Sequence, residues 1–276
     1  FLTNEDMDRI RNQIQTPLEK WGPQTNVWVW KYANPNDLYY ISADVARGDG
    51  KDYSTFHVLN SNSNEIVAEF KGKIPPDQFS DLLVEAARRY NDAIICPESN
   101  TYGYAVLMKL KEAGYKNIYF EKEKDRFNAL YGNGAIGRAG FSTQGASRAK
   151  ILTKLEEVIR NNKVRIYSSR LLDEFKTFIW SKGKAQANRG ANDDLVMSLA
   201  IGVWLLDTDV VLSQKGTDIN DAMLKAFQMN RKPENNESRD KAFAHFSSVY
   251  TSRGIPVVMD PNNSLISGSI DFKWLL

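Results

Sequence analysis

The fold of this chain is decided by residues 38–70, which contain the segments LYYISADVA (38–46), STFHVL (54–59) and EIVAEF (65–70). All three segments are rich in β-branched and aromatic residues, as strands are. The breaks between them, RGDGKD (47–52) and NSNSN (60–64), are short and polar. Short connections join neighbouring antiparallel strands. These residues therefore predict a three-stranded antiparallel meander.

After residue 75 the pattern changes to helices that alternate with short apolar strands. The spacing of apolar residues predicts helices over 75–90, 104–113 and 146–161, with strands over 93–97 and 117–120. A further helix, over 194–206, is apolar nearly all round and should be buried. Strands and helices in this order are typical of a sheet with helices on its faces. The sequence thus predicts an α/β fold with a mixed central sheet.

Composition divides the chain into three parts. Residues 1–37 are interpreted as an N-terminal helix and strand leading into the domain, and residues 38–228 as the domain itself. Residues 229–276 are interpreted as a polar linker, NRKPENNESRD over 230–240, followed by a C-terminal extension. No run approaches 18 apolar residues, so no membrane contact is predicted.

The charge balance and the rarity of Cys and His limit the chemistry of the chain. It has 36 Lys and Arg against 34 Asp and Glu, a net charge of +2. This balance neither indicates nor excludes a nucleic-acid-binding protein, because binding depends on a local basic patch rather than on the net charge. One cysteine and two histidines cannot supply a disulfide framework or a usual zinc ligand set. Carboxylates are therefore the favoured ligands of any metal site.

Four acidic residues stand where a predicted strand ends or the buried helix begins. Asp44 lies near the end of the first strand, Glu98 follows the strand 93–97, and Asp193 and Asp194 start the buried helix. Reactive groups of sheet proteins gather at such positions. Taken alone, each acid has a structural explanation, and Asp193 in particular could be the N-cap of its helix.

The adjacent pair Asp193-Asp194 is harder to explain structurally, because only one of the two is needed as a cap. Like charges beside a core are costly unless a cation offsets them. Converging carboxylates without His or Cys favour a hard cation, Mg²⁺ or Mn²⁺. Two such ions can activate water and stabilise the leaving oxygen in phosphodiester cleavage. The acids therefore predict a metal-dependent hydrolase.

These motifs resemble the nuclease domain of the large terminase subunit, the DNA-packaging motor of tailed bacteriophages, with T-even-like myophages as the nearest match. The resemblance rests on SADVARGDGKDYS (42–54), CPESN (96–100) and ANDDLVMSLA (191–200). It implies an RNase H-like (resolvase/integrase) fold. It also implies a catalytic, metal-binding triad of Asp44, Glu98 and one of Asp193 or Asp194, with Asp193 favoured. Asp52 would lie beside the metal ligands rather than among them.

The resemblance further implies an endonuclease that cuts concatemeric double-stranded viral DNA when headful packaging begins and ends. Two Mg²⁺ or Mn²⁺ ions are the implied cofactors. The implied partners are double-stranded DNA, the ATPase domain of the same full-length protein, the portal protein and the small terminase subunit. The implied location is the cytoplasm of an infected host cell, and transiently the procapsid portal. The phosphate-loop pattern of an ATPase does not occur here, so we expect the nuclease part of a longer protein.

Basic residues near the acids are predicted to contact the DNA backbone without sequence preference. They lie beside Asp44, in the loop 121–140, at the start of the helix 146–161 and on a hairpin predicted around 181–184. The alternative for part of them is an ordinary solvated surface. The predicted set is Arg47, Lys51, Lys122, Lys124, Arg126, Arg148, Lys150, Lys182 and Lys184.

Two other functions stay open. A Holliday-junction resolvase or transposase-like nuclease of the same fold would be distinguished by the structure of its DNA products. A non-catalytic docking domain, whose acids only cap and pair, would be insensitive to Asp44→Asn and would need no metal. The apolar end DFKWLL (271–276), after a polar linker, makes docking to a partner plausible under each of these functions.

Overall fold

The computed structural model describes residues 1–121, 138–181, 183–207, 249–250 and 256–257. The chain divides into two compact units, Phe1–Gln214 and Lys215–Leu276. In the second unit the described residues form one antiparallel pair, β11 (Val249–Tyr250) with β12 (Pro256–Val257). No helix within the described ranges combines the length and the apolar character that a membrane crossing requires.

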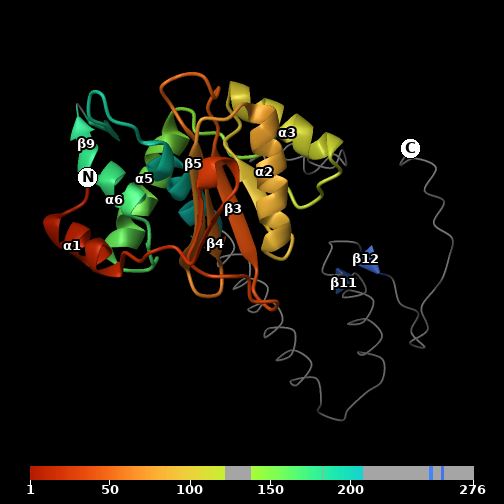
Figure 1. The fold of residues 1–276 in the computed structure, drawn as a ribbon, viewed down its shortest axis with the longest axis horizontal. Helices are drawn as coiled ribbons and strands as arrows, with labels where there is room; N and C mark the ends of the chain where they lie inside the picture. The colour runs from red at the N-terminus through yellow and green to blue at the C-terminus, as the bar shows by residue number, and fades with distance from the viewer. Residues whose placement is uncertain (122–137, 182, 208–248, 251–255, 258–276) are drawn as a thin grey trace, which may run out of the picture. The chain divides into compact units, whose positions relative to one another are not determined.

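A six-stranded mixed sheet forms the centre of the first unit (Figure 1). The strands are β1 (Glu19–Trp21), β2 (Val27–Val29), β3 (Tyr39–Asp44), β4 (Ser54–Asn60), β5 (Glu65–Gly72) and β6 (Ile94–Pro97). Their order in the sheet is β1-β2-β5-β4-β3-β6, and only the pair β3–β6 is parallel within this sheet. The predicted meander is β3-β4-β5, and the prediction of an α/β fold with a mixed sheet is confirmed.

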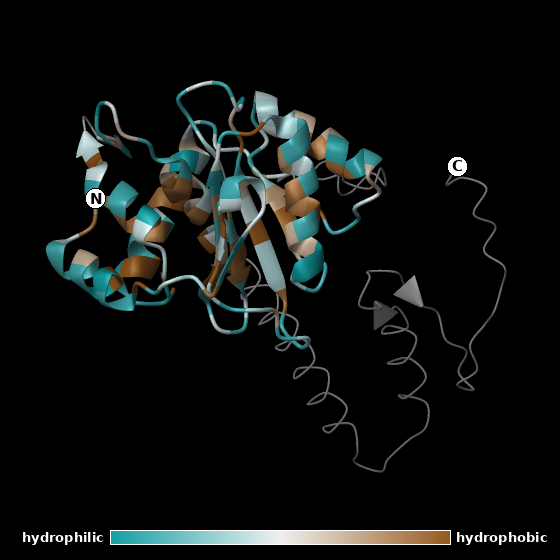
Figure 2. Ribbon diagram, in the orientation of Figure 1, coloured by the Kyte–Doolittle hydropathy of each residue, from teal (hydrophilic) through white to brown (hydrophobic). Residues whose placement is uncertain are grey.

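Helices cover both faces of this sheet (Figure 1). On one face lie α2 (Pro76–Arg89) and α3 (Thr101–Glu112). The other face packs against α1 (Asn4–Gln13), α5 (Ala146–Arg160), α6 (Ser169–Thr177) and a helix of residues 194–207. Figure 2 shows hydrophobic residues on the strands between the two helix layers and hydrophilic residues on outer turns of the helices.

Shorter elements connect these layers. A single 3₁₀ turn, η1, spans Pro23–Thr25. Two small antiparallel pairs lie outside the main sheet. They are β7 (Phe120–Glu121) with β8 (Arg138–Ala139), and β9 (Phe178–Ser181) with β10 (Lys184–Ala187). The hairpin predicted around 181–184 corresponds to β9–β10.

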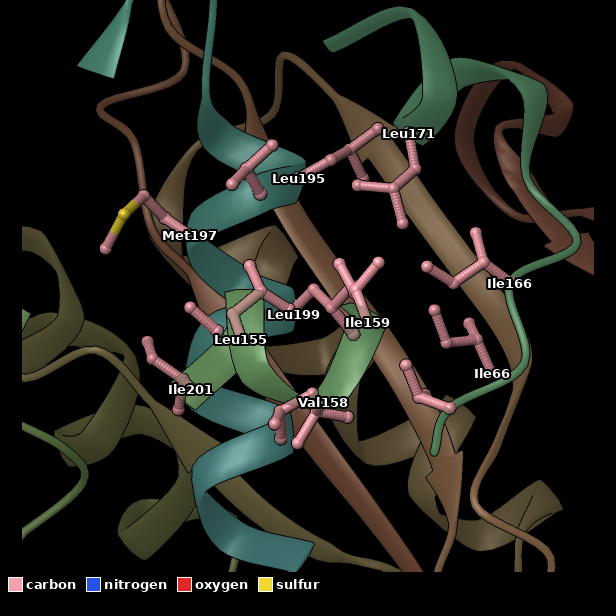
Figure 3. Packing of buried hydrophobic residues seen from close by; sticks show 14 of the residues in the cluster. Ile66, Leu155, Val158, Ile159, Ile166, Leu171, Leu195, Met197, Leu199 and Ile201 are labelled. Atoms are coloured by element: carbon pink, nitrogen blue, oxygen red, sulfur yellow. The ribbon is translucent and has the colours of Figure 1, made fainter. Parts of the chain in front are cut away.

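The 194–207 helix is buried between the sheet and α5, as its apolar sequence predicts. Figure 3 shows Leu155 and Val158 of α5 meeting Leu199 and Ile201 of this helix. Gly202 permits a close approach to the sheet, because a methyl group there would lie 2.6 Å from Ser42 Oγ. Close packing of this kind leaves the helix little freedom to shift along the strands.

The N-terminal segment belongs to this unit rather than only leading into it. β1 and β2 extend the sheet beyond β5, with Val27 opposite Phe70. The boundary expected at residue 37 therefore falls inside one compact unit. The pairing joins residues about forty positions apart, so no local pattern in 1–37 announces it. The boundary expected at 228, and most of 229–276, lie outside the described residues.

Candidate active site

Asp44 and Glu98 come from the two parallel neighbours of the sheet. Asp44 ends β3, Glu98 follows β6, and the backbone N–H of Glu98 donates to the carbonyl oxygen of Ala43 at 2.8 Å. Successive side chains of a strand point to opposite faces. Both acids continue the face that carries Tyr40 and Cys96, the face covered by the 194–207 helix. The structure thus brings these two predicted residues together.

Asp193 and Asp194 approach the same edge from the start of the 194–207 helix. Asp194 is buried, and its Oδ2 accepts the backbone N–H of Tyr53 and a hydrogen bond from Asn192 Nδ2, both at 3.1 Å. Asp193 is partly exposed, and its Oδ2 accepts from Arg148 Nη2 at 2.9 Å. Each of the two carboxylates is therefore held by a donor from another part of the chain.

Negative charge accumulates at this edge. The pKa of Asp44 is raised well above its usual range, first by burial and then by the carboxylates of Glu98, Asp194 and Asp193. Burial likewise raises the pKa of Asp194 to about 6, and the charge of Asp52 adds to the rise, while the Tyr53 hydrogen bond opposes it. Acids that raise one another's pKa are near neighbours without enough cationic compensation. All four predicted acids therefore share one electrostatic site.

Asn100 connects Glu98 to the start of α3. Its Nδ2 donates to Glu98 Oε2 at 2.9 Å, while its Oδ1 accepts the backbone N–H of Gly103 at 2.7 Å as the N-cap of α3. Gly103 allows this packing, because a methyl group there would lie 1.6 Å from the carbonyl oxygen of Glu98. The position and the direction of the Glu98 side chain are thus set by the first turn of α3.

A chain of buried hydrogen bonds ties the 194–207 helix to the sheet. Thr55 Oγ1 on β4 donates to the backbone carbonyl of Asp194 at 2.9 Å. Further along, Ser198 Oγ and His57 Nδ1 are 3.0 Å apart, and His57 Nε2 lies 3.2 Å from Glu69 Oε2. Buried polar groups of this kind fix one arrangement when all are satisfied. His57 therefore has a structural role in this buried network and lies away from the sheet edge where the four acids converge.

The donor set of the site suits a hard divalent cation. Carboxylate oxygens are the preferred ligands of Mg²⁺ and Mn²⁺. Burial and then the neighbouring carboxylates raise the pKa of Asp44, and a cation would offset both effects. Among the described residues, no three His, Cys, Asp or Glu side chains already form a ligand cage. Asp193 is turned to Arg148 and Asp194 to Tyr53. The residues thus fit a metal in chemistry and charge, with ligand geometry that is not preformed.

The predicted basic residues take different places. Arg148 contacts the acids directly, through Asp193. Arg47 is exposed and pairs with Asp49, with Nη2 to Oδ2 at 2.8 Å. Lys51, Lys150 and Lys184 are exposed. The remaining predicted residues, Lys122, Lys124, Arg126 and Lys182, lie outside the described residues.

Sequence reasoning missed several side chains that hold the acids. Asn100 and Asn192 stand next to the acids inside the quoted motifs, so their amide side chains were a usable signal. Tyr53 acts through its backbone N–H, which no residue type announces. Glu174 on α6 accepts backbone N–H groups of the acid-bearing helix. An isolated glutamate on an amphipathic helix gives no sequence signal of such a role.

No family model matches the chain. It is similar in structure to the large terminase nuclease from thermophilic phage G20c, solved with bound magnesium, at 19% identity and a TM-score of 0.55. The match covers 72% of this chain and 95% of that one. The large terminase nuclease domain of Thermus phage P74-26 matches at 20% identity and a TM-score of 0.52, over 71% and 92% of the two chains.

The likeness to these structures establishes the fold at this level of identity. The chain has an RNase H-like fold, as the family resemblance of its motifs implied. The finer expectation, a T-even-like phage, stays a prediction, because the two structures described above come from phage G20c and Thermus phage P74-26.

Proposed function

We propose that this chain is a divalent-metal-dependent endonuclease of the large-terminase type. It would cut concatemeric double-stranded viral DNA when headful packaging begins and ends. The observation that carries the proposal is the convergence of Asp44, Glu98 and the pair Asp193-Asp194, where burial and then the neighbouring carboxylates raise the pKa of Asp44. The structural likeness to a terminase nuclease with bound magnesium supports the same chemistry.

In this proposal Asp44 and Glu98 are ligands of the metal, joined by Asp193, Asp194 or both. A pair of divalent ions held there would supply an activated water and a charge that stabilises the leaving oxygen. The chain itself contributes orientation. The β3–β6 ladder fixes Asp44 beside Glu98, Asn100 directs the Glu98 carboxylate, and the donors of Tyr53 and Asn192 direct Asp194.

Basic residues on the elements that carry or contact the acids support the choice of DNA as substrate. Arg148 lies within the site, and exposed Lys51, Lys150 and Arg47 come from the loop after β3 or from α5. Lysine and arginine contacts to phosphate give binding that is independent of sequence and sensitive to salt. Cutting with little sequence preference is what filling a head with DNA requires.

The biological setting follows from the same proposal. The partners would be double-stranded DNA, the ATPase domain of a full-length protein, the portal protein and the small terminase subunit. The protein would work in the cytoplasm of an infected cell and transiently at the procapsid portal. A pull-down of portal protein and small subunit by the chain, at near-physiological salt, checks each partnership separately.

Plasmid cleavage tests the proposed activity. Supercoiled DNA is incubated with the chain in Mg²⁺, in Mn²⁺ and in EDTA. Asp44→Asn is compared with Asp77→Asn, an exposed aspartate at the start of α2 on the opposite face of the sheet. We expect metal-dependent linear and smeared products that Asp44→Asn abolishes and Asp77→Asn leaves unchanged. Cleavage that persists in EDTA or in Asp44→Asn contradicts the proposal.

A four-way junction substrate separates the proposal from its main alternative. Symmetrical nicking of the junction, with linear duplex left intact, would identify a resolvase of the same fold. Absence of cleavage in every metal by a folded chain would favour the docking-domain alternative.

A further inference from the structure

The first turn of the 194–207 helix needs hydrogen-bond acceptors that its own backbone does not supply. The first backbone N–H groups of any helix lack partners within the helix. An aspartate just before the first turn is the usual solution, because its carboxylate accepts from the second or third N–H of the helix. Asp193 holds that position here. If its carboxylate served as the cap, it would be withdrawn from the metal site.

The structure uses a different residue as the cap. Glu174, on α6, accepts the N–H of Leu195 at 2.9 Å and the N–H of Val196 at 3.2 Å through its Oε2. These are the groups that an Asp193 cap would satisfy. The Asp193 carboxylate instead accepts from Arg148, at the edge where the acids converge.

Glu174 is itself held in place from two sides. Its Oε1 lies 2.6 Å from Lys71 Nζ, on β5, and Lys71 stacks over the Tyr53 ring with 4.8 Å between the ammonium and the ring centroid. The N–H of Tyr53 holds Asp194. The cap and the donors to Asp194 share one surface cleft of about 470 Å³, lined in part by Tyr53, Lys71, Glu174 and Asn192.

The helix that carries Glu174 is also anchored. Ser168, the N-cap of α6, donates to Glu69 Oε1 at 2.8 Å, and Arg170 donates to the same oxygen at 2.9 Å. Glu69 is fully buried on β5. The carboxylate of Glu174 thus reaches the acid-bearing helix from a support fixed to the sheet, 21 residues away along the chain.

We propose that Glu174 is a positioning residue of the metal site. It caps the acid-bearing helix from a separate element, and this keeps the Asp193 carboxylate off its own helix, at the edge where a metal ion would bind. Without Glu174, two buried N–H groups lose their acceptor, and Asp193 is the acceptor closest in sequence. It then turns back onto its own helix. The inference rests on the proposed function, because it assigns the acid pair to metal binding.

Calorimetric titration with Mn²⁺ alone, without DNA, tests this role. The titrations are run at pH 8, above the pKa of Glu174, which burial raises to about 7. Glu174→Ala removes the cap, and Glu174→Asp shortens its reach by one carbon. Both should weaken Mn²⁺ binding about 10-fold, the size of effect that residues supporting metal ligands have. Glu174→Gln keeps an oxygen acceptor and should stay within about 3-fold of the unmodified chain.

Two comparisons show whether the effect passes through Asp193. Asp173→Ala, an exposed neighbour on α6 that pairs with Lys176 at 2.7 Å, serves as the matched control and should bind Mn²⁺ normally. In an Asp193→Ala background, Glu174→Ala should cause little additional loss of Mn²⁺ affinity. Asp193, the residue that Glu174→Ala would turn away from the metal, is already absent there.

The results distinguish this inference from the proposed function. Unchanged Mn²⁺ affinity in folded Glu174→Ala or Glu174→Asp, with only a lower melting temperature, would overturn the positioning role. A loss that simply adds to that of Asp193→Ala would also overturn it. Failure of the unmodified chain to bind Mn²⁺, or equal binding by Asp44→Asn, would contradict the proposed function and the inference with it.

Discussion

The two faces of the central sheet bury side chains of different character. Toward α2 and α3, β3 directs Tyr39, Ile41 and Ala43 into a cluster made almost wholly of hydrocarbon. Toward α5, α6 and the 194–207 helix, the alternate positions of β3 carry Ser42 and then Asp44. One strand therefore serves a stabilising face and a face that leads to the acids.

The neighbouring strands repeat this difference. On β4, Phe56 and Val58 belong to the hydrocarbon cluster, whereas Thr55 and His57 hydrogen-bond toward the acid-bearing helix and β5. Burial of apolar groups is non-directional, while buried hydrogen bonds fix distances and directions. Both faces bury an apolar core, but only the acid-bearing face adds the buried hydrogen bonds that fix the geometry of the site. Changes on the two faces should therefore have separable effects.

The largest expected effect on the apolar face comes from Phe79→Ala on α2. Phe79 is fully buried and lies beside Phe70 and Phe56, with ring centroids 5.9 and 6.3 Å away. Truncating such a residue costs about 3–5 kcal/mol of unfolding free energy. Urea denaturation measures this loss. The Mn²⁺ affinity of the folded variant should be unchanged. A large change in this affinity would contradict the separate effects expected for the two faces.

On the other face, Asp44→Asn should reverse this pattern. Residues that only support metal ligands affect function about 10–100-fold, so loss of a ligand should lower the cleavage rate by at least about 100-fold. The metal-free variant should be more stable than the unmodified chain, because a partly buried carboxylate that its neighbours repel is gone. Melting curves in EDTA check this, and destabilisation by Asp44→Asn would contradict the shared electrostatic site.

Asn100 offers a smaller and finer test of the polar face. Asn100→Ala removes both the cap of α3, worth about 1 kcal/mol, and the hydrogen bond to Glu98. Asn100→Ser keeps a capping oxygen and loses the amide donor. Both variants should weaken Mn²⁺ binding about 10-fold, while only Asn100→Ala should lose stability. If Asn100→Ser binds Mn²⁺ as the unmodified chain does, Asn100 only caps α3.

The smallest expected effect is a pH dependence of stability from Asp194. Its pKa in the folded chain is about 6, above the ordinary 3.8, so the folded state binds this proton more tightly than the unfolded state. The resulting stabilisation is complete below about pH 4 and is lost as pH rises through about 6. In EDTA, the stability of Asp194→Asn relative to the unmodified chain should therefore increase between pH 4.5 and 7, by on the order of 1–2 kcal/mol.

Melting curves of both proteins across this range measure the difference, which cancels the contributions of other acids. Saturating Mn²⁺ should reverse the trend for the unmodified chain, because a bound cation favours the ionised carboxylate. A stability difference that does not change with pH would mean that burial and neighbouring charge do not raise the pKa of Asp194.

Local patterns were enough to predict the meander and the strand that precedes Glu98, whereas the strand expected over 117–120 is only a bridge at Ile118 and the start of β7. Alternation and short polar breaks identify β3, β4 and β5, and the structure pairs β6 with β3. Asp44 and Glu98 then meet because both follow the same face of adjacent strands. The buried 194–207 helix was predicted from its continuous apolar sequence.

Long-range contacts account for what the sequence did not reveal. The pairing of β2 with β5 leaves no mark in residues 1–37, because strand pairing depends on the partner as well as on the strand. Asp193 had the position of an ordinary N-cap, yet Glu174 takes that role from another helix. Residue types and their spacing do not show which of several possible acceptors takes the hydrogen bond from a given N–H group.

The most direct test of the metal site is the anomalous scattering of a crystal soaked in Mn²⁺. The account predicts an anomalous peak at the edge where β3 and β6 end, bounded by carboxylate oxygens of Asp44 and Glu98 and of Asp193, Asp194 or both. The same map would show which residue of the pair is a ligand. A fully soaked crystal without a peak at this edge, or with manganese bound only elsewhere, would contradict the account.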